Sequence, residues 1–228
     1  MVKRIWNSSL GKKYIMAITG LVLVGFVIAH LIGNLQIFIG REALNRYGHF
    51  LQTTPELVWP ARIGLLVMVA LHIIAAISLT RENRAARPVP YAHYEIVAAS
   101  YASRTMFMSG LIVLVFIIYH LLHFTVQVPQ INLTGQDFRL LEDSKQRHDI
   151  YGMMVAGYRN PLVSGFYVLG IALLSLHLSH GISSLFQSLG LSNSVYMRFL
   201  EKLAKVVAVA IFIGYISIPA AVLMGVVK

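Results

Sequence analysis

Residues 19–31 read TGLVLVGFVIAHL, and residues 109–121 read SGLIVLVFIIYHL. The two stretches align at an offset of 90 residues, which places Gly20 over Gly110 and His30 over His120. Runs this apolar are typical of membrane helices, in which a histidine is costly and usually functional. Two related helical halves are therefore expected, and a weaker match between Leu71-His72 and Leu176-His177 extends the repeat to a second helix of each half.

Five stretches are long and apolar enough to cross a bilayer, which takes roughly 20 residues of helix. Hydrophobic residues make up 57% of the 228 and charged residues 12%, with a mean hydropathy of +0.70, so a soluble class is excluded. We expect an all-α integral membrane protein, a single transmembrane domain over residues 1–228. Its five-helix bundle has predicted spans at Tyr14–Ile39, Val58–Leu79, Thr105–Val128, Leu162–Phe186 and Leu203–Val227.

Lysine and arginine set the expected orientation, because both are enriched in cytoplasmic loops. With the N-terminus inside, the inner segments carry eleven basic and three acidic residues. The outer segments then carry eight basic and six acidic residues. We therefore expect a cytoplasmic N-terminus, with Lys228 outside. The net charge of +10 then reflects topology and lipid contact, and no nucleic-acid partner is expected.

The segments between the spans differ in character. Arg41–Gln52 is too short and polar to span and is predicted to form a surface helix that ends near Pro55. Pro129–Asn160 is predicted to be a long polar outer loop. Thr80–Arg104, with two prolines and several aromatic residues, is predicted to face the cytoplasm and to dock a soluble partner. Pro219 is expected to kink the fifth helix.

Histidines are concentrated in the spans. At 1.5 Å of rise per residue, His30 and His120 lie roughly 24–25 Å from the basic residues at the inner surface. His72 and His177 lie only roughly 13–15 Å from that surface. Depth therefore pairs His30 with His120 toward the outside, and His72 with His177 toward the inside. A single membrane histidine is often just a packed, hydrogen-bonded side chain, but here each of four helices supplies at least one.

Two histidines from different helices at one depth can hold an iron from both sides, because neutral imidazole is a good iron ligand. Such a centre has no open position for a substrate and suits electron transfer. The chain has no cysteine, which excludes covalent haem attachment and iron–sulfur ligation. The sequence predicts two non-covalent b haems between helices one to four, with His30, His72, His120 and His177 as iron ligands.

The histidine motifs, in order, are FVIAHL at residues 26–31, ALH at 70–72, IYH at 118–120, GFYVLG at 165–170 and HLSHGI at 177–182. They resemble the single-chain, di-haem cytochrome b558 subunit of bacterial succinate dehydrogenase and fumarate reductase, over nearly the whole chain. In that family the helix-four ligand precedes one glycine by four residues and another by thirteen. His177 meets both conditions and His180 does not, and the repeat likewise favours His120 over His123.

The resemblance implies a membrane-anchor subunit of succinate:quinone oxidoreductase in a bacterial cytoplasmic membrane, with no dehydrogenase active site of its own. Its partners would be a flavoprotein with covalent FAD and an iron–sulfur subunit, both on the cytoplasmic side. Electrons would pass through the inner haem (His72, His177) and the outer haem (His30, His120), with menaquinone as the substrate. The chain would thus serve the respiratory chain and the tricarboxylic acid cycle.

One position departs from part of the family. Some of its fumarate reductases carry a membrane glutamate two residues before the helix-four ligand, as part of a proton path. This chain has Ser175 there, and the predicted spans contain no Asp or Glu. We therefore expect that proton path to be absent, which favours succinate oxidation over fumarate reduction.

Other polar residues have weaker interpretations. Arg159 is placed to pair with propionates of the outer haem, and Lys12 or Lys13 with those of the inner haem, although simple snorkelling explains each equally well. A quinone pocket near His49 or Trp59 is an open alternative. The remaining histidines, His93 and His148, are expected to be solvated or at interfaces.

Two other functions remain open at this stage. The chain could be the cytochrome b anchor of another di-haem redox complex, such as a hydrogenase or formate dehydrogenase. It could also be a haem-free, histidine-lined metal transporter, although such a path should carry acidic or polar coordinating residues, which the spans nearly lack.

Overall fold

The computed structural model describes residues 6, 8–86, 101–191, 193 and 195–228, and within these ranges it is helical, with five helices long and apolar enough to cross a membrane. This confirms the predicted all-α class and the five spans. The segment 87–100, which holds His93 and most of the predicted docking region, lies outside the described residues. The membrane helices are α2 (Ser9–Asn34), α4 (Pro55–Ala85), α5 (Tyr101–His120), α7 (Pro161–Ser188) and α8 (Met197–Leu223).

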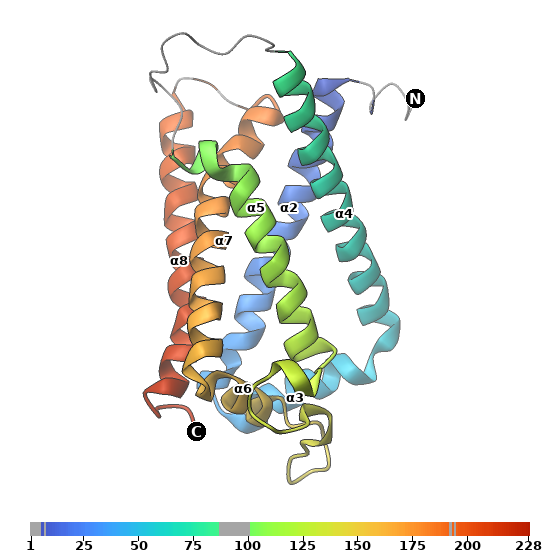
Figure 1. The fold of residues 1–228 in the computed structure, drawn as a ribbon, viewed down its shortest axis with the longest axis vertical. Coiled ribbons are helices and arrows are strands. Elements are labelled where there is room, and N and C mark those ends of the chain that lie inside the picture. Colours follow the sequence, from blue (N-terminus) through green and yellow to red (C-terminus); the bar gives the residue numbers. More distant parts are fainter. Residues whose placement is uncertain (1–5, 7, 87–100, 192, 194) are drawn as a thin grey trace.

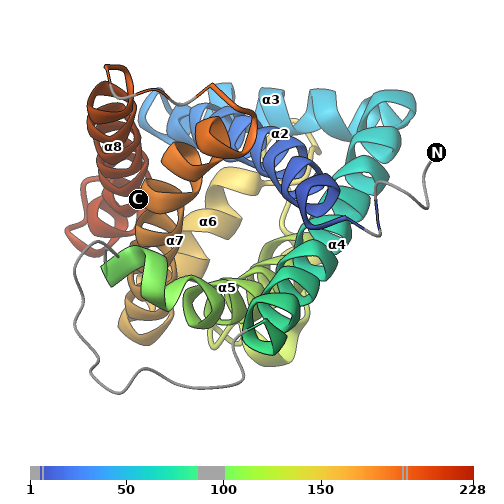
Figure 2. The same cartoon turned by 90° about the horizontal axis from the view of Figure 1, so that it is seen from above.

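The helices run beside one another between two faces of the bundle (Figure 1). We call the end formed by Ser9, Ala85, Tyr101, Ser188 and Met197 the N face, and the opposite end, which holds the C-terminus, the C face. Helix α7 is central, since it packs on α2, α5 and α8, whereas α4 packs mainly on α2 (Figure 2). Most of α4 therefore faces outward, as a lipid-exposed helix should.

Helix ends follow local sequence signals. The Ser8 side chain accepts a hydrogen bond from the Gly11 amide at 2.9 Å and caps α2. Asn160 caps α7 through the Leu162 amide, and Pro161 takes the first helical position, where its missing N–H costs nothing. Pro219 lies inside α8, as expected.

Helix α4 is longer than its predicted span. It begins at Pro55 and continues to Ala85, so that Glu56 lies in its first turn and Glu82 near its last. The expectation that no acid falls within a span is thus corrected at both ends of α4, although its middle has none. The extension is possible because Pro55 starts a helix well and no breaker follows Leu79 until after Ala85.

Each half of the repeat carries a short helix on the C face. Between α2 and α4, a 3₁₀ turn (Leu35–Phe38) leads into α3 (Arg41–Thr53), which confirms the predicted surface helix. Between α5 and α7 lie a π-helical turn, η2 (Leu121–Thr125), two 3₁₀ turns (Pro129–Ile131, Phe138–Leu140) and α6 (Ile150–Arg159). The prediction of a polar loop over Pro129–Asn160 missed α6, whose ten residues include two glycines and give little helical signal.

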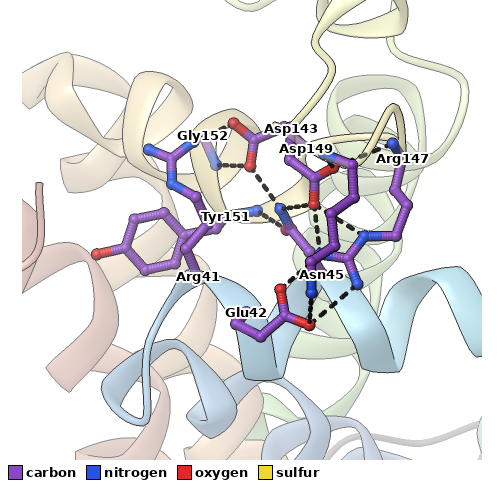
Figure 3. Close-up of polar contacts among 9 residues, drawn as sticks. Arg41, Glu42, Asn45, Asp143, Arg147, Asp149, Tyr151 and Gly152 are labelled. Carbon is purple, nitrogen blue, oxygen red and sulfur yellow. Dashed lines mark hydrogen bonds and ion pairs between the residues drawn. The ribbon is translucent and has the colours of Figure 1, made fainter.

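Asn45 on α3 joins the two short helices (Figure 3). Its side chain is fully buried, and its amide nitrogen donates to Asp149 at 2.9 Å and to Asp143 at 3.2 Å. Its oxygen accepts from the Tyr151 amide at 2.9 Å. Asp149 in turn caps α6 through the Gly152 amide. A single buried amide therefore fixes α3 against the start of α6.

Replacing Asn45 with alanine is expected to lower the free energy of unfolding by about 2–3 kcal/mol, because it strands the buried Tyr151 amide and removes two donors from buried carboxylates. Unfolding in mixed detergent micelles, followed by circular dichroism, measures the change. Gln52→Ala removes an exposed amide from the same helix and should cost less than about 0.5 kcal/mol. Equal effects of the two variants would contradict this role for Asn45.

A second layer of charge surrounds this contact (Figure 3). Arg147 donates to Glu42 on α3 at 2.8 Å and to Asp143 at 2.6 Å, and Lys145 donates to Glu42 at 2.9 Å. Hydrogen bonds from Arg147 and then Lys145 lower the pKa of Glu42 from 4.5 to about 2. Arg147 also lowers the pKa of Asp143. Both carboxylates are therefore held in the charged form by their partners.

The C face is expected to loosen in acid. A carboxylate with a lowered folded-state pKa stabilises the fold above its unfolded pKa and loses that contribution as the pH falls through its folded pKa. For Glu42 this window runs from about pH 4.5 to about pH 2. Amide hydrogen exchange, corrected for the intrinsic pH dependence, should rise in α3 and α6 across this window and stay constant in α7. Glu42→Gln should remove much of the pH dependence of exchange in α3 and α6. An exchange profile in this variant equal to that of the wild type would contradict the role of Glu42.

Candidate functional site

The four predicted ligands lie on four different helices, with His30 on α2, His72 on α4, His120 on α5 and His177 on α7. The rings of His30 and His120 lie with their centroids 5.7 Å apart and almost perpendicular, at 79°. Two imidazoles on one metal ion should have centroids roughly 6 Å apart, given about 2 Å per metal–nitrogen bond plus the ring radii. The pair toward the C face therefore has the spacing of a two-ligand site.

His72 is oriented by a hydroxyl of the neighbouring helix. The Thr19 oxygen lies 3.0 Å from His72 Nδ1 and donates its own hydrogen to the Ile15 carbonyl at 2.7 Å. Since its hydrogen is used there, the buried Thr19 oxygen accepts from an Nδ1–H of His72. This tautomer leaves the Nε2 lone pair of His72 available to a metal.

His177 has the equivalent arrangement in the other half of the repeat. The Ser109 oxygen lies 3.2 Å from His177 Nδ1 and donates to the Met106 carbonyl at 3.1 Å. The next residue is a glycine in both halves, and a Cβ placed on Gly20 or Gly110 would lie 3.5 Å from Cε1 of the respective histidine. The aligned Thr19-Gly20 and Ser109-Gly110 pairs thus hold corresponding histidines in the same way.

The two histidine pairs lie at different depths. Thr19 precedes His30 by eleven residues on α2, and Ser109 precedes His120 by eleven residues on α5. This spacing separates the two levels by about 16 Å along each helix. His72 and His177 therefore lie toward the N face, and His30 and His120 lie toward the C face.

The residues around His120 were not predicted to be functional. The Tyr167 hydroxyl of α7 lies 3.4 Å from His120 Nδ1 and 3.0 Å from His123 Nδ1. His123 lies in the π-helical turn η2, is fully buried, and has an Nε2 atom without a hydrogen-bond partner in the described structure. The available signal was that Tyr167 precedes His177 by ten residues, which places it about 15 Å along α7, at the level of His120.

The residues with weaker predicted roles differ in burial and in hydrogen-bond partners. Lys12 is buried and paired with Glu82, so its charge is already neutralised, while Lys13 is exposed. His148 is held by the Leu141 carbonyl and by Gln127, which makes it a loop-fixing residue. Ser175 is buried, and its hydroxyl has no partner among the described residues. The other positions are exposed or half-buried at the surface of the bundle: His49, Trp59, Arg159 and His180.

The donor set suits a haem iron. Each level offers two imidazoles from different helices. A metal that takes four ligands from a macrocycle needs two more. A zinc ion takes three or four protein ligands, and over the described residues no three of His, Cys, Asp and Glu come together. The His30–His120 pair would therefore suit one haem iron by spacing and donor type, and His72 and His177 would suit a second by donor type.

No family model matches the chain, and no match was found among the curated proteins or the solved structures. The histidines on four helices and the hydroxyls that orient them are the features of the chain that point to a function.

Proposed function

We propose that this chain is the membrane-anchor cytochrome b subunit of a succinate:quinone oxidoreductase. In this role it carries electrons between a cytoplasmic iron–sulfur subunit and menaquinone in a bacterial cytoplasmic membrane, using two non-covalent b haems. The observation that supports it most is the duplicated histidine arrangement, with two levels, an eleven-residue spacing in both halves, and a hydroxyl that fixes the tautomer of each N-face histidine.

His72 and His177 would hold the haem nearer the N face, and His30 and His120 the haem nearer the C face. When bound, the two haems supply reversible one-electron chemistry within the bilayer. The protein's contribution is orientation, because Thr19 and Ser109 hold the two N-face imidazoles with Nε2 free. With two histidines holding each iron, no position would stay open, so these residues would exclude oxygen or substrate from the metal.

The surroundings are apolar, and this favours electron transfer over side reactions. Helices α2, α4, α5 and α7 carry no Asp or Glu between their terminal turns. A dry environment of low polarity keeps protons and water from the metal and tunes its potential.

The partners are proposed from the charge pattern and the resemblance. Described basic residues gather at the N face, including Lys12, Lys13, Arg81, Arg84, Arg198, Lys202 and Lys205, which supports a cytoplasmic position for it. The flavoprotein and iron–sulfur subunits would dock there. The His72–His177 level lies nearer this face and would exchange electrons with the iron–sulfur subunit first. The quinone would react closer to the His30–His120 level.

Succinate-driven reduction in native membranes tests the proposal. Succinate should reduce b-type absorption bands that co-purify with this chain, and a flavin-bearing partner should co-purify with them. Malonate, which competes with succinate at the flavoprotein, should block the reduction, whereas dithionite should still reduce both centres. Bands that respond to dithionite but never to succinate would indicate another di-haem complex and overturn the proposed partner set.

A further inference from the structure

Tyr167 places a single hydroxyl between two imidazoles. Its oxygen is 3.4 Å from His120 Nδ1 and 3.0 Å from His123 Nδ1, and the tyrosine is almost completely buried, with 4% of its surface exposed. A phenol has one hydrogen to donate, so it can donate to only one of the two nitrogens and must accept from the other.

The direction of these bonds follows if His120 binds iron. A neutral imidazole that gives its Nε2 lone pair to a metal carries its hydrogen on Nδ1. His120 Nδ1–H then donates to the Tyr167 oxygen, and the Tyr167 hydroxyl donates to His123 Nδ1. The opposite direction would place the hydrogen of His120 on Nε2 and block ligation.

In this arrangement His123 accepts at Nδ1 and carries its own hydrogen on Nε2, which has no partner among the described residues. His123 is fully buried. Its ring centroid lies 4.0 Å from that of Phe124 and 5.7 Å from that of Phe138. The π-helical turn adds a residue to the helix just after His120, and turns of this kind are frequent at functional sites. Packing on these sides holds the His123 ring, so that its Nδ1 stays directed at Tyr167.

The other histidines have no such chain. His72 and His177 donate to aliphatic hydroxyls whose own hydrogens go to backbone carbonyls. The ring of His30 stacks on Phe26, and no side-chain hydrogen bond to it occurs within the described ranges. Tyr167 therefore marks His120 as different from the other three ligands.

We infer that Tyr167, anchored by His123, is a positioning residue that fixes the tautomer of His120 and lowers the reduction potential of the C-face centre alone. The inference rests on the proposed haem ligation. An acceptor on Nδ1–H makes an imidazole more basic and so stabilises the oxidised iron. A hydroxyl that itself donates onward is a stronger acceptor, which is why His123 contributes.

A redox titration of the purified, haem-loaded protein, followed by optical and electron paramagnetic resonance spectra, tests this inference. Tyr167→Phe should make reduction of the C-face centre about tenfold more favourable, which equals about 59 mV for one electron. It should also shift the low-spin resonance of that centre and leave the other centre unchanged. His123→Phe should shift the potential in the same direction by a smaller amount.

Tyr119→Phe is the matched control. Tyr119 belongs to the same aromatic cluster, with its ring centroid 5.9 Å from that of Tyr167, but its hydroxyl donates to the Ile131 carbonyl at 3.3 Å. This variant should leave the reduction potentials of both haem centres unchanged. The inference is overturned if Tyr167→Phe behaves like Tyr119→Phe, or if it shifts both centres equally. Wild-type protein without haem would instead overturn the proposed function, and this inference with it.

Discussion

Replacing His72 or His177 with alanine is expected to remove one of two b-type centres and to leave the other intact. The two histidine levels are separated by about 16 Å along α2 and α5, and they share no ligand. Loss of one axial imidazole should therefore lower the haem content from two per chain to about one. Haem per polypeptide and the reduced-minus-oxidised spectrum measure the result directly.

The matched control uses the next histidine on the same helix. His180 lies one turn after His177 and is half-buried, but no hydrogen bond of its side chain is found among the described residues. His180→Ala should keep both centres, and His30→Ala should remove the centre that His72→Ala retains. If His72→Ala left both bands, or if His180→Ala removed one, the assignment of ligands would be wrong.

The double variant Thr19→Val with Ser109→Ala is expected to weaken haem binding at the N-face level by about 10–100-fold, as is typical when the partner of a metal-binding histidine is lost. Both changes are close to isosteric, but they remove the buried oxygens that accept from His72 and His177. Each imidazole can then adopt the other tautomer or rotate. Haem retention during dilution or transfer to apomyoglobin measures the change.

Two other membrane hydroxyls serve as controls for this variant. The Thr80 hydroxyl donates to the Ala76 carbonyl at 2.8 Å, and the Ser183 hydroxyl to the His180 carbonyl at 2.9 Å. These bonds stay within one helix. Thr80→Val with Ser183→Ala should therefore retain both haems as wild type does. Equal loss in the two double variants would point to general loosening of the bundle and would contradict a specific role for Thr19 and Ser109.

The membrane helices could be predicted from sequence because their signal is strong. Each span is a long apolar run, and a bilayer admits few other structures for such a run. The short helix α6 carried no comparable signal, since Gly152 and Gly157 lower its helical propensity and its start depends on a side-chain cap by Asp149. Asp149 is in turn held by Asn45, which lies more than a hundred residues earlier and could not be paired with it from sequence.

The candidate site was predicted only in part. Depth and the repeat identified the histidines, because position along a helix converts directly into height in the membrane. The repeat also aligned Thr19 with Ser109, but sequence could not show that both oxygens face a histidine, since this depends on how α2 and α5 are rotated against α4 and α7. Tyr167 was present in a quoted motif without a role, because the π-helical turn that brings His123 to it has no sequence signature.

The haem content and spin state of the protein, purified in mild detergent from membranes with its partners, test the proposed histidine ligation most directly. We predict two b haems per chain, both low-spin in the oxidised and the reduced state, as expected when two histidines bind each iron. A colourless protein, a single haem per chain, or a high-spin iron with an open position would contradict it.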